Sequence, residues 1–382
     1  MKILHLVFAL AGSTVALPKC ESWTEDGFKH PGIYHNCTSL DRIQTNYNGD
    51  SSAYADALTS SQSRLSALQE SDTWEMSGPY ESVNWAGGDG HNIPLQTDGK
   101  SAYALTLGWY ATGNSLWLSR AKEIVLAWGS TLKDLNEQIQ GGEGIGYMTA
   151  AAEILRATAS DSGWSSENTT TWLTMIDTVT STWNSSYGIA RNDFFMNQGC
   201  YGNNGAMSLA VFSNNRTLYD EMVRQATIGE NPDSSIDYAI PLQMGRDQAH
   251  PMGTLRGLAF MGTTAKIQGG SDFYNQNSSR LLAGYEYWAR YNGGDDTVPW
   301  EPKEIRPGSG EIYDKLVNTS RGRNYAESAQ PLEAIGVAYH EYYRSNRIDD
   351  MPYYSSYMKW QGIGWDTFEW GDDGSVGYLD LL

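Results

Sequence analysis

The hydrophobic residues of this chain recur mostly every three or four positions, which is the spacing of helices that bury one face. Ser101–Tyr110 and Leu116–Trp128 form the clearest pair, and the turn Thr112-Gly113-Asn114 separates them. Further helices are expected at 58–68, 146–157, 170–183, 204–212, 218–226, 252–267, 280–291 and 332–344. Alternating patterns typical of strands are scarce, and Gly, Asn and Pro lie between the predicted helices. The pattern therefore predicts an all-α protein built from successive helical hairpins.

These hairpins lack the fixed period of a repeat array, so a helical solenoid and a closed (α/α) toroid both fit the pattern. No Pro/Ser-rich linker or low-complexity segment interrupts them, and we expect one domain over residues 17–382.

The first 16 residues have the pattern of a secretory signal peptide. Lys2 precedes a short apolar run at 4–11, and Thr14-Val15-Ala16 offers a small-residue cleavage site. The run is too short to span a bilayer, so we expect a secreted, extracellular protein with no membrane contact. Asn-x-Ser/Thr sequons favour the same compartment and predict glycosylation. They lie at Asn36, Asn168, Asn184, Asn215, Asn277 and Asn318.

Composition excludes two classes of protein. The 382 residues include 26 basic and 45 acidic side chains, a net charge of -19, which argues against nucleic-acid binding. With 40% hydrophobic residues and 14 Trp, the chain can bury a large core and is not a disordered protein.

The three cysteines suggest one disulfide. Cys20 and Cys37 are close in sequence near the mature N-terminus, and we expect them to pair. Cys200 is then left over, and a buried free thiol is favoured over a nucleophile because no supporting pattern surrounds it. No metal-binding motif is present, so no metal and no cofactor is expected.

Three motifs concentrate histidine with other polar groups. His30 and His35 flank a Pro-Gly turn, His91 ends a Gly-rich loop that begins at Trp85, and His250 closes Gly245-Arg246-Asp247-Gln248-Ala249-His250 before a helix. Polar groups entering a helix N-terminus could bind an anion, although a solvated helix cap would give the same pattern. His340, within a predicted helix, is more typical of a packed residue.

Two further stretches combine amides, aromatic rings and arginine, the side chains that bind sugars. One is 197–205, with Gln198, Asn203 and Asn204, and the other is 285–293, with Arg290 and Tyr291. Trp288 has the spacing of a core position instead.

These motifs together resemble the alginate-lyase-like polysaccharide lyases. The resemblance rests on the His30–His35 motif, Asp98–Trp128, Ala151–Arg156, the Arg246–His250 motif, and Glu286–Asn292 followed by Val298-Pro299, in that order along the chain. It implies an (α/α) toroid of about six to seven helical hairpins that cleaves a uronic-acid polysaccharide, such as alginate or glucuronan, by β-elimination. The best-known toroid lyases carry Asn-Asn-His, whereas this chain has Asn203-Asn204-Gly205.

The chemistry then suggests a role for each candidate. His250 and Tyr291 are expected to serve as base and acid, and Asn204, with Gln198, Gln248 or Arg246, to neutralise the substrate carboxylate. The remaining expected substrate contacts are Asn203, His30, His35, His91, Trp85, Arg290 and Arg323. We expect a monomer acting on an anionic uronate polymer.

Two other functions fit the same residues. A glycoside hydrolase on the toroid would need two facing carboxylic acids, for which Asp89, Glu143, Asp247 and Glu286 are candidates. A non-catalytic carbohydrate-binding protein would bind sugar without turnover.

The charge is unevenly distributed along the chain. Residues 246–323 carry 10 basic and 9 acidic side chains, a net +1 in an acidic protein. We therefore expect the basic residues of this stretch to line a locally positive site for a polyanion. They include Arg246, Arg256, Arg290, Lys303, Arg306, Arg321 and Arg323.

Overall fold

The computed structural model describes residues 16–49, 52–60, 74–84, 90–181, 196–228, 236, 242–304, 310–316, 335–361 and 365–371. The strands within this part of the chain are short and pair two by two. β1 (Trp23–Glu25) pairs antiparallel with β2 (Phe28–His30), β3 (Ser82–Val83) runs parallel to β4 (Asp134–Leu135), and β5 (Lys303–Glu304) pairs antiparallel with β6 (Ile312–Tyr313).

Helices make up most of the described structure, as the hydrophobic spacing predicted. The early helices are α1 (Cys37–Tyr47) and α2 (Ser52–Ser60). The hairpins that follow are α4 (Asn92–Thr112) with α5 (Ser115–Thr131), α6 (Gln140–Ala157) with α7 (Ala159–Ser162) and α8 (Ser166–Ser181), α9 (Met196–Phe212) with α10 (Arg216–Ile228), and α11 (Ala249–Gln268) with α12 (Gln276–Asn292). A 3-10 turn at Leu242–Gly245 precedes α11, and α13 (Gly336–Arg344), a 3-10 turn at Ile348–Asp350, α14 (Pro352–Gln361) and α15 (Trp365–Trp370) complete the described part.

The sequence-predicted turn between the first two long helices is confirmed. Gly113 ends α4 with a left-handed φ of 75°, a conformation that glycine adopts without strain. The Asn114 side chain accepts hydrogen bonds from the amides of Leu116 and Trp117, which caps α5.

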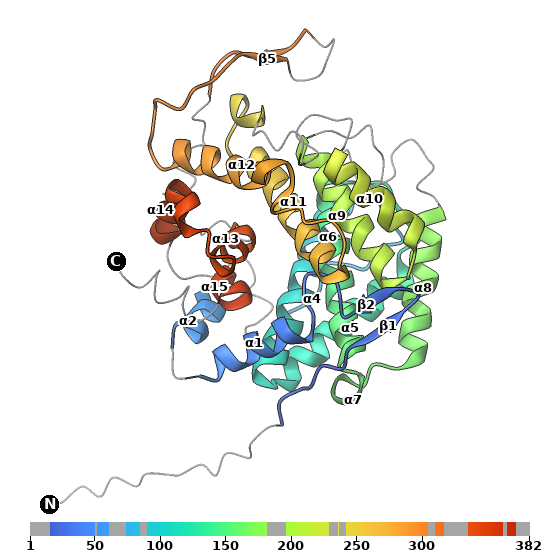
Figure 1. Ribbon diagram of the computed structural model, residues 1–382. Helices are drawn as coiled ribbons and strands as arrows, with labels where there is room; N and C mark the ends of the chain where they lie inside the picture. Colours follow the sequence, from blue (N-terminus) through green and yellow to red (C-terminus); the bar gives the residue numbers. More distant parts are fainter. Residues whose placement is uncertain are drawn as a thin grey trace, which may run out of the picture.

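The hairpins curl into a ring, which decides between the solenoid and the toroid in favour of the toroid. Helices α4, α6, α9 and α11 pack side by side in that order, α13 follows α11, and α15 follows α13. Helix α1 packs against both α15 and α4 and so closes the ring (Figure 1). Helices α5, α10 and α12 each pack against the ring helix that precedes them in the chain, namely α4, α9 and α11.

Glycines allow the inner helices to approach backbone to backbone. A Cβ atom at Gly99 of α4 would lie 2.2 Å from the carbonyl oxygen of Gly144 in α6. A Cβ at Gly142 would lie 2.8 Å from the carbonyl oxygen of Tyr201 in α9. Small residues therefore set the spacing of the inner ring.

We expect the Gly99→Ala variant to lose ~1–3 kcal/mol of unfolding free energy, because its methyl group meets backbone that has little freedom to move. Urea titration followed by circular dichroism measures the loss. Thr174→Ala on the exposed side of α8 is a control for helix substitution, with an expected change within ~0.5 kcal/mol. An equally small change in Gly99→Ala would contradict the close approach.

The centre of the ring is filled rather than open. Tyr34, from the segment after β2, is buried against the rings of Tyr103 in α4, Tyr147 in α6 and Phe260 in α11. Its hydroxyl accepts a hydrogen bond from Asn204 Nδ2 in α9 at 2.7 Å. The N-terminal segment thus reaches the middle of the toroid and packs against four inner helices.

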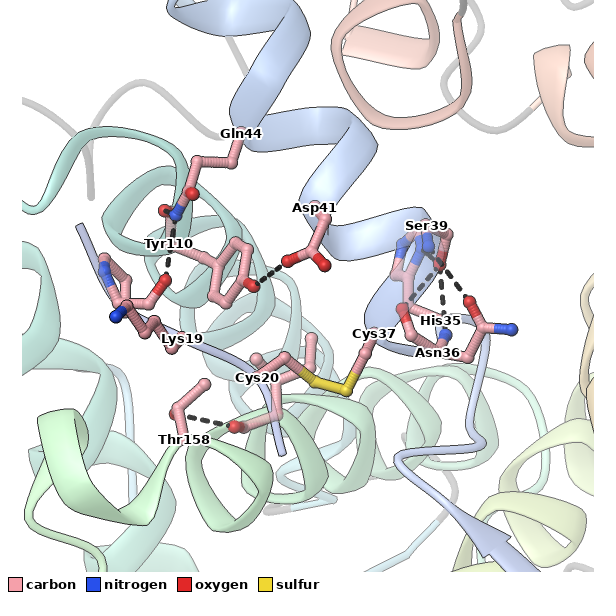
Figure 2. Close-up of a disulfide and its surroundings, with 12 residues drawn as sticks. Lys19, Cys20, His35, Asn36, Cys37, Ser39, Asp41, Gln44, Tyr110 and Thr158 are labelled. Atoms are coloured by element: carbon pink, nitrogen blue, oxygen red, sulfur yellow. Dashed lines mark hydrogen bonds between the residues drawn. A yellow bond between two sulfur atoms is a disulfide. The ribbon is translucent and has the colours of Figure 1, made fainter. Parts of the chain in front are cut away.

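The expected disulfide is confirmed. Cys20 and Cys37 are bonded, and the bond joins the N-terminal segment to the start of α1 (Figure 2). Nearby, Gln44 donates to the Tyr110 carbonyl oxygen at 2.8 Å and Tyr110 donates to Asp41 at 2.6 Å, so α1 is also tied to α4. Cys200 is buried and unbonded to another cysteine, as predicted.

Among the described helices, none is long and apolar enough to cross a membrane.

Candidate active site

The four inner helices α4, α6, α9 and α11 run in the same direction, so the ring has two unlike rims. Near their N-termini, Gln96, Glu143, Tyr201 and Arg256 are joined by hydrogen bonds. Near the C-termini of α6 and α9, Glu153 and Asn214 are joined through His30. We call these ends the N-terminal rim and the C-terminal rim.

His250 lies on the N-terminal rim, in the first turn of α11, and pairs with Asp247. The imidazole Nδ1 lies 2.6 Å from Asp247 Oδ2, while Asp247 Oδ1 accepts the amides of Ala249 and His250. Burial opposes ionisation of Asp247, but the hydrogen bonds from His250 and the backbone lower the pKa of this carboxyl. A carboxylate facing Nδ1 fixes the orientation of the ring and leaves Nε2 for a reacting group. The His250 side chain is 19% exposed.

The end of α12 is fastened to the loop that carries His250. Trp288 Nε1 donates to the Gln248 carbonyl oxygen at 2.9 Å, and Asn292 Nδ2 donates to Gln248 Oε1 at 3.0 Å. Tyr291 lies between these two contacts in sequence and is 6% exposed. The structure therefore brings the segments of His250 and Tyr291 together. Trp288 is a core residue, as its spacing indicated, and Gln248 is buried between the two segments.

A second polar group on the N-terminal rim joins four helices, and we call it the rim network. Glu143 of α6 accepts a hydrogen bond from Arg256 of α11 at 2.5 Å and one from Gln96 of α4, and Lys100 Nζ of α4 lies 3.3 Å away. Arg256 also donates to the Tyr201 hydroxyl of α9 at 2.7 Å.

The rim network stays charged at neutral pH. Burial opposes ionisation of Glu143, but Arg256, Lys100 and Gln96 lower the pKa of this carboxyl. Burial raises the pKa of Tyr201 to about 12 even though Arg256 opposes the shift, so the phenol remains protonated. One carboxylate is thus shared by two cations, and the network carries one net positive charge.

The predicted amide residues of α9 lie deeper in the ring. Asn203 and Asn204 are 2% and 5% exposed, and Asn204 is already bonded to Tyr34. Within the described part of the chain, the side-chain oxygens of both have no hydrogen-bond partner. Gln198, nearer the start of α9, is partly exposed.

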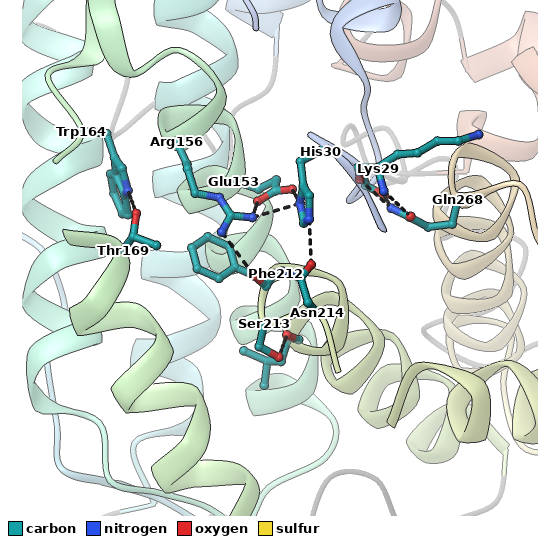
Figure 3. A network of polar contacts seen from close by, with 12 residues as sticks. Lys29, His30, Glu153, Arg156, Trp164, Thr169, Phe212, Ser213, Asn214 and Gln268 are labelled. Atoms are coloured by element: carbon teal, nitrogen blue, oxygen red, sulfur yellow. Dashed lines mark hydrogen bonds and ion pairs between the residues drawn. The ribbon is translucent and has the colours of Figure 1, made fainter. Parts of the chain in front are cut away.

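His30 lies on the C-terminal rim and not beside His250. Its Nδ1 lies 2.6 Å from Glu153 Oε1 and its Nε2 lies 2.8 Å from Asn214 Oδ1 (Figure 3). The neighbouring Lys29 binds Gln268 at the far end of α11. Because 18 residues of α11 separate His250 from Gln268, the two sites are roughly 27 Å apart along the helix. His30 is 1% exposed and fastens the N-terminal hairpin to the ring.

The two other predicted histidines also have defined places. His35 is fully buried, stacks on Trp370, and has its Nε2 3.5 Å from Glu369 Oε1. His91 precedes α4 on the N-terminal rim, is partly exposed and stacks on Tyr80. The structure thus places His91 at the same end as His250, and His35 inside the packed ring. His340 is buried within α13, as its position indicated.

The predicted basic residues are divided between sites. Arg256 belongs to the rim network, and Arg246 is exposed beside the His250 loop, with Nε 3.9 Å from Asp247. Arg290 instead pairs with Asp295 at 2.6 Å, and Lys303 lies on β5. Several further predicted residues lie outside the described part of the chain, namely Trp85, Asp89, Arg306, Arg321, Arg323 and the sequons at Asn184 and Asn318.

Lys100, Gln96 and Tyr201 were not predicted as site residues from the sequence. Gln96 and Lys100 are four residues apart and therefore share one face of α4, but an amide and a lysine at that spacing are common on solvated helices. Their importance depends on Glu143 and Arg256, which are distant in sequence. Among the described residues, no group of three His, Cys, Asp or Glu side chains could hold a metal ion.

A helical toroid with a carboxylate-oriented imidazole, tyrosines and cations at one rim has the fold and the groups of a polysaccharide lyase. The comparisons with known proteins agree with this class. The family model described as alginate lyase matches residues 52–300, which is most of the chain. The protein belongs to the alginate lyase family and is a polysaccharide lyase.

A solved structure shares the fold. The crystal structure of an alginate lyase from Bacteroides ovatus superposes with a TM-score of 0.59 over 89% of this chain and 99% of that chain. The two sequences are 13% identical, so the likeness concerns the fold alone. No curated protein matches this sequence.

Proposed function

We propose that this protein is a secreted, glycosylated lyase that cleaves polymannuronate or glucuronan by β-elimination and leaves 4,5-unsaturated uronate ends. The observation that carries the proposal is the His250–Asp247 pair at the N-terminal rim, held beside the α12 segment of Tyr291 by Gln248. The family places the reaction among the polysaccharide lyases.

The reaction removes the proton at C5 of a uronate and expels the oxygen at C4. His250 supplies the base, because Asp247 faces Nδ1 and leaves Nε2 to accept the proton. The negative charge that develops spreads into the uronate carboxylate, so a cation beside that carboxylate lowers the barrier. Arg246 suits this role because its side chain is 52% exposed, four residues from His250.

Tyr291 supplies the proton to the leaving oxygen. It belongs to the last turn of α12, the turn that Trp288 and Asn292 fasten to Gln248. In mannuronate and glucuronate the C5 proton and C4 oxygen lie on the same face of the sugar. A phenol on that face can therefore protonate the leaving oxygen. His250 meanwhile retains the proton taken from C5 or shares it with the phenol.

The hydrolase alternative receives less support from the same geometry. A hydrolase needs two carboxyl groups facing one bond. Glu143 is engaged by Arg256 and Gln96, Asp247 by His250, and Glu286 of α12 by the amides of Tyr353 and Tyr354. Each of these carboxyls therefore serves a different set of partners.

Assays on a panel of uronate polymers test the proposal. Polymannuronate or glucuronan, incubated with the protein purified from a secreting host, should yield products that absorb in the near ultraviolet, because the new C4–C5 double bond is conjugated to the carboxylate. Polyguluronate and pectate complete the panel. New reducing ends without ultraviolet absorbance would instead identify a hydrolase, and oligosaccharide binding with neither signal would identify a binding protein.

A further inference from the structure

We propose that the rim network is a carboxylate-binding subsite, formed by Lys100, Arg256 and Tyr201, for the uronate residue next to the one that loses its proton. This inference rests on the proposed function and extends it to the neighbouring sugar. It concerns residues on α4, α9 and α11 that the elimination step itself does not use.

The charge balance of the network is the first argument. The Glu143 side chain is 5% exposed and accepts hydrogen bonds from Arg256 and Gln96, while Lys100 Nζ lies farther away at 3.3 Å. The Lys100 and Arg256 side chains keep 25% and 16% of their surface exposed. The excess positive charge therefore lies on the open side of the network, where a second carboxylate can approach.

The donor geometry is the second argument. Arg256 donates to the Tyr201 oxygen, which leaves the phenol hydrogen to donate to another acceptor. Because its pKa is about 12, Tyr201 keeps that hydrogen at neutral pH. Ammonium, guanidinium and phenol donors from three helices are the groups that bind a carboxylate by charge-assisted hydrogen bonds.

The location is the third argument. Arg256 and His250 are six residues apart on α11, a rise of roughly 9 Å. A purely structural ion pair would be equally stable at either rim, and the Glu153–Arg156 pair at the C-terminal rim is such a pair, with Glu153 fully buried and His30 covering it. Unlike the Glu153–Arg156 pair, the rim network contains an additional, partly exposed cation, Lys100.

Lys100→Met tests the subsite directly. We expect KM for the uronate polymer to rise ~10-fold, with kcat close to that of the wild type, because a charge-assisted contact to a non-reacting sugar is lost. The increase of KM with added salt should also become less steep. Lys122→Met is the matched control, because the Lys122 ammonium donates to the carbonyl oxygens of Ser162 and Gly163 at the end of α7, away from the rim network.

Gly253→Ala tests the Tyr201 donor without changing any charge. A Cβ at Gly253 would lie 2.5 Å from the Tyr201 hydroxyl, so the phenol must move while the backbone stays in place. Gly257→Ala, one turn later, meets Cys200 instead and is the control for α11 packing. We expect KM to rise in Gly253→Ala and not in Gly257→Ala, with both melting temperatures recorded.

Calorimetric titration with uronate oligosaccharides and neutral oligosaccharides separates this inference from the proposed function. If the wild type gives no unsaturated product from any uronate polymer, the proposed function fails, but weaker uronate binding in Lys100→Met still supports the subsite. If Lys100→Met and Gly253→Ala bind uronate oligosaccharides and turn over polymer with wild-type KM and salt dependence, the network is structural and the inference is wrong.

Discussion

Replacement of His250 by alanine is expected to lower kcat by ~10²–10⁴-fold, the usual contribution of a positioned base. The imidazole is in the first turn of α11, and its removal leaves the amide contacts of Asp247 with Ala249 and residue 250 in place. The fold should therefore survive, which far-ultraviolet circular dichroism and thermal unfolding will show. Turnover is measured from the absorbance of the unsaturated product.

Two additional measurements separate a base from a binding residue. Added imidazole should partly restore activity to the alanine variant, because it can occupy the vacated space and accept the proton. Asp247→Asn should lower activity less than His250→Ala, because the amide can still cap α11 but no longer favours a proton on Nδ1. An alanine variant with wild-type kcat would refute the assignment of His250.

Replacement of Tyr291 by phenylalanine is expected to lower kcat by a similar ~10²–10⁴-fold, because the leaving oxygen loses its proton donor. The ring itself is retained, so the packing of this 6% exposed side chain on α12 should change little. KM should stay near the wild-type value, since the phenol acts mainly in the transition state. Steady-state kinetics on the polymer measure both constants.

Tyr285→Phe is the matched control for this substitution. Tyr285 is on the same helix and is fully buried, and its hydroxyl has no hydrogen-bond partner among the residues that the structure describes. Removal of the Tyr285 hydroxyl should leave turnover unchanged and cost little stability, because no hydrogen bond is lost. If Tyr291→Phe behaves like Tyr285→Phe, the proton donor is another residue.

The sequence predicted the helices of the fold well because their signals are local. The turn at Gly113 and Asn114 has both a left-handed glycine and a capping asparagine, and the structure confirms each. The choice between solenoid and ring could not be made from periodicity, because it depends on contacts between α1 and α15 at opposite ends of the chain.

The candidate site was predicted only in part, for the same reason. The Arg246–His250 motif lies within five residues, and its Asp247–His250 contact spans three, so local spacing was informative. His30 and His35 looked alike in sequence, but partners at 153, 214 and 369 bury them away from His250. The rim network joins residues 96, 143, 201 and 256, and no pattern along one segment indicates that these meet.

Ring closure has a consequence for how the chain folds. Asn46 of α1 donates to the Gly371 carbonyl oxygen at 3.1 Å, and Tyr103 of α4 donates to Glu369 at 2.7 Å, across 325 and 266 residues of sequence. An open array can add one hairpin at a time on a finished neighbour. Here the first helices lack part of their core until the last ones have been synthesised, so loop-closure entropy must be overcome before these contacts form. The chain should accordingly gain its final stability in one late step, after nearly all of it has left the ribosome.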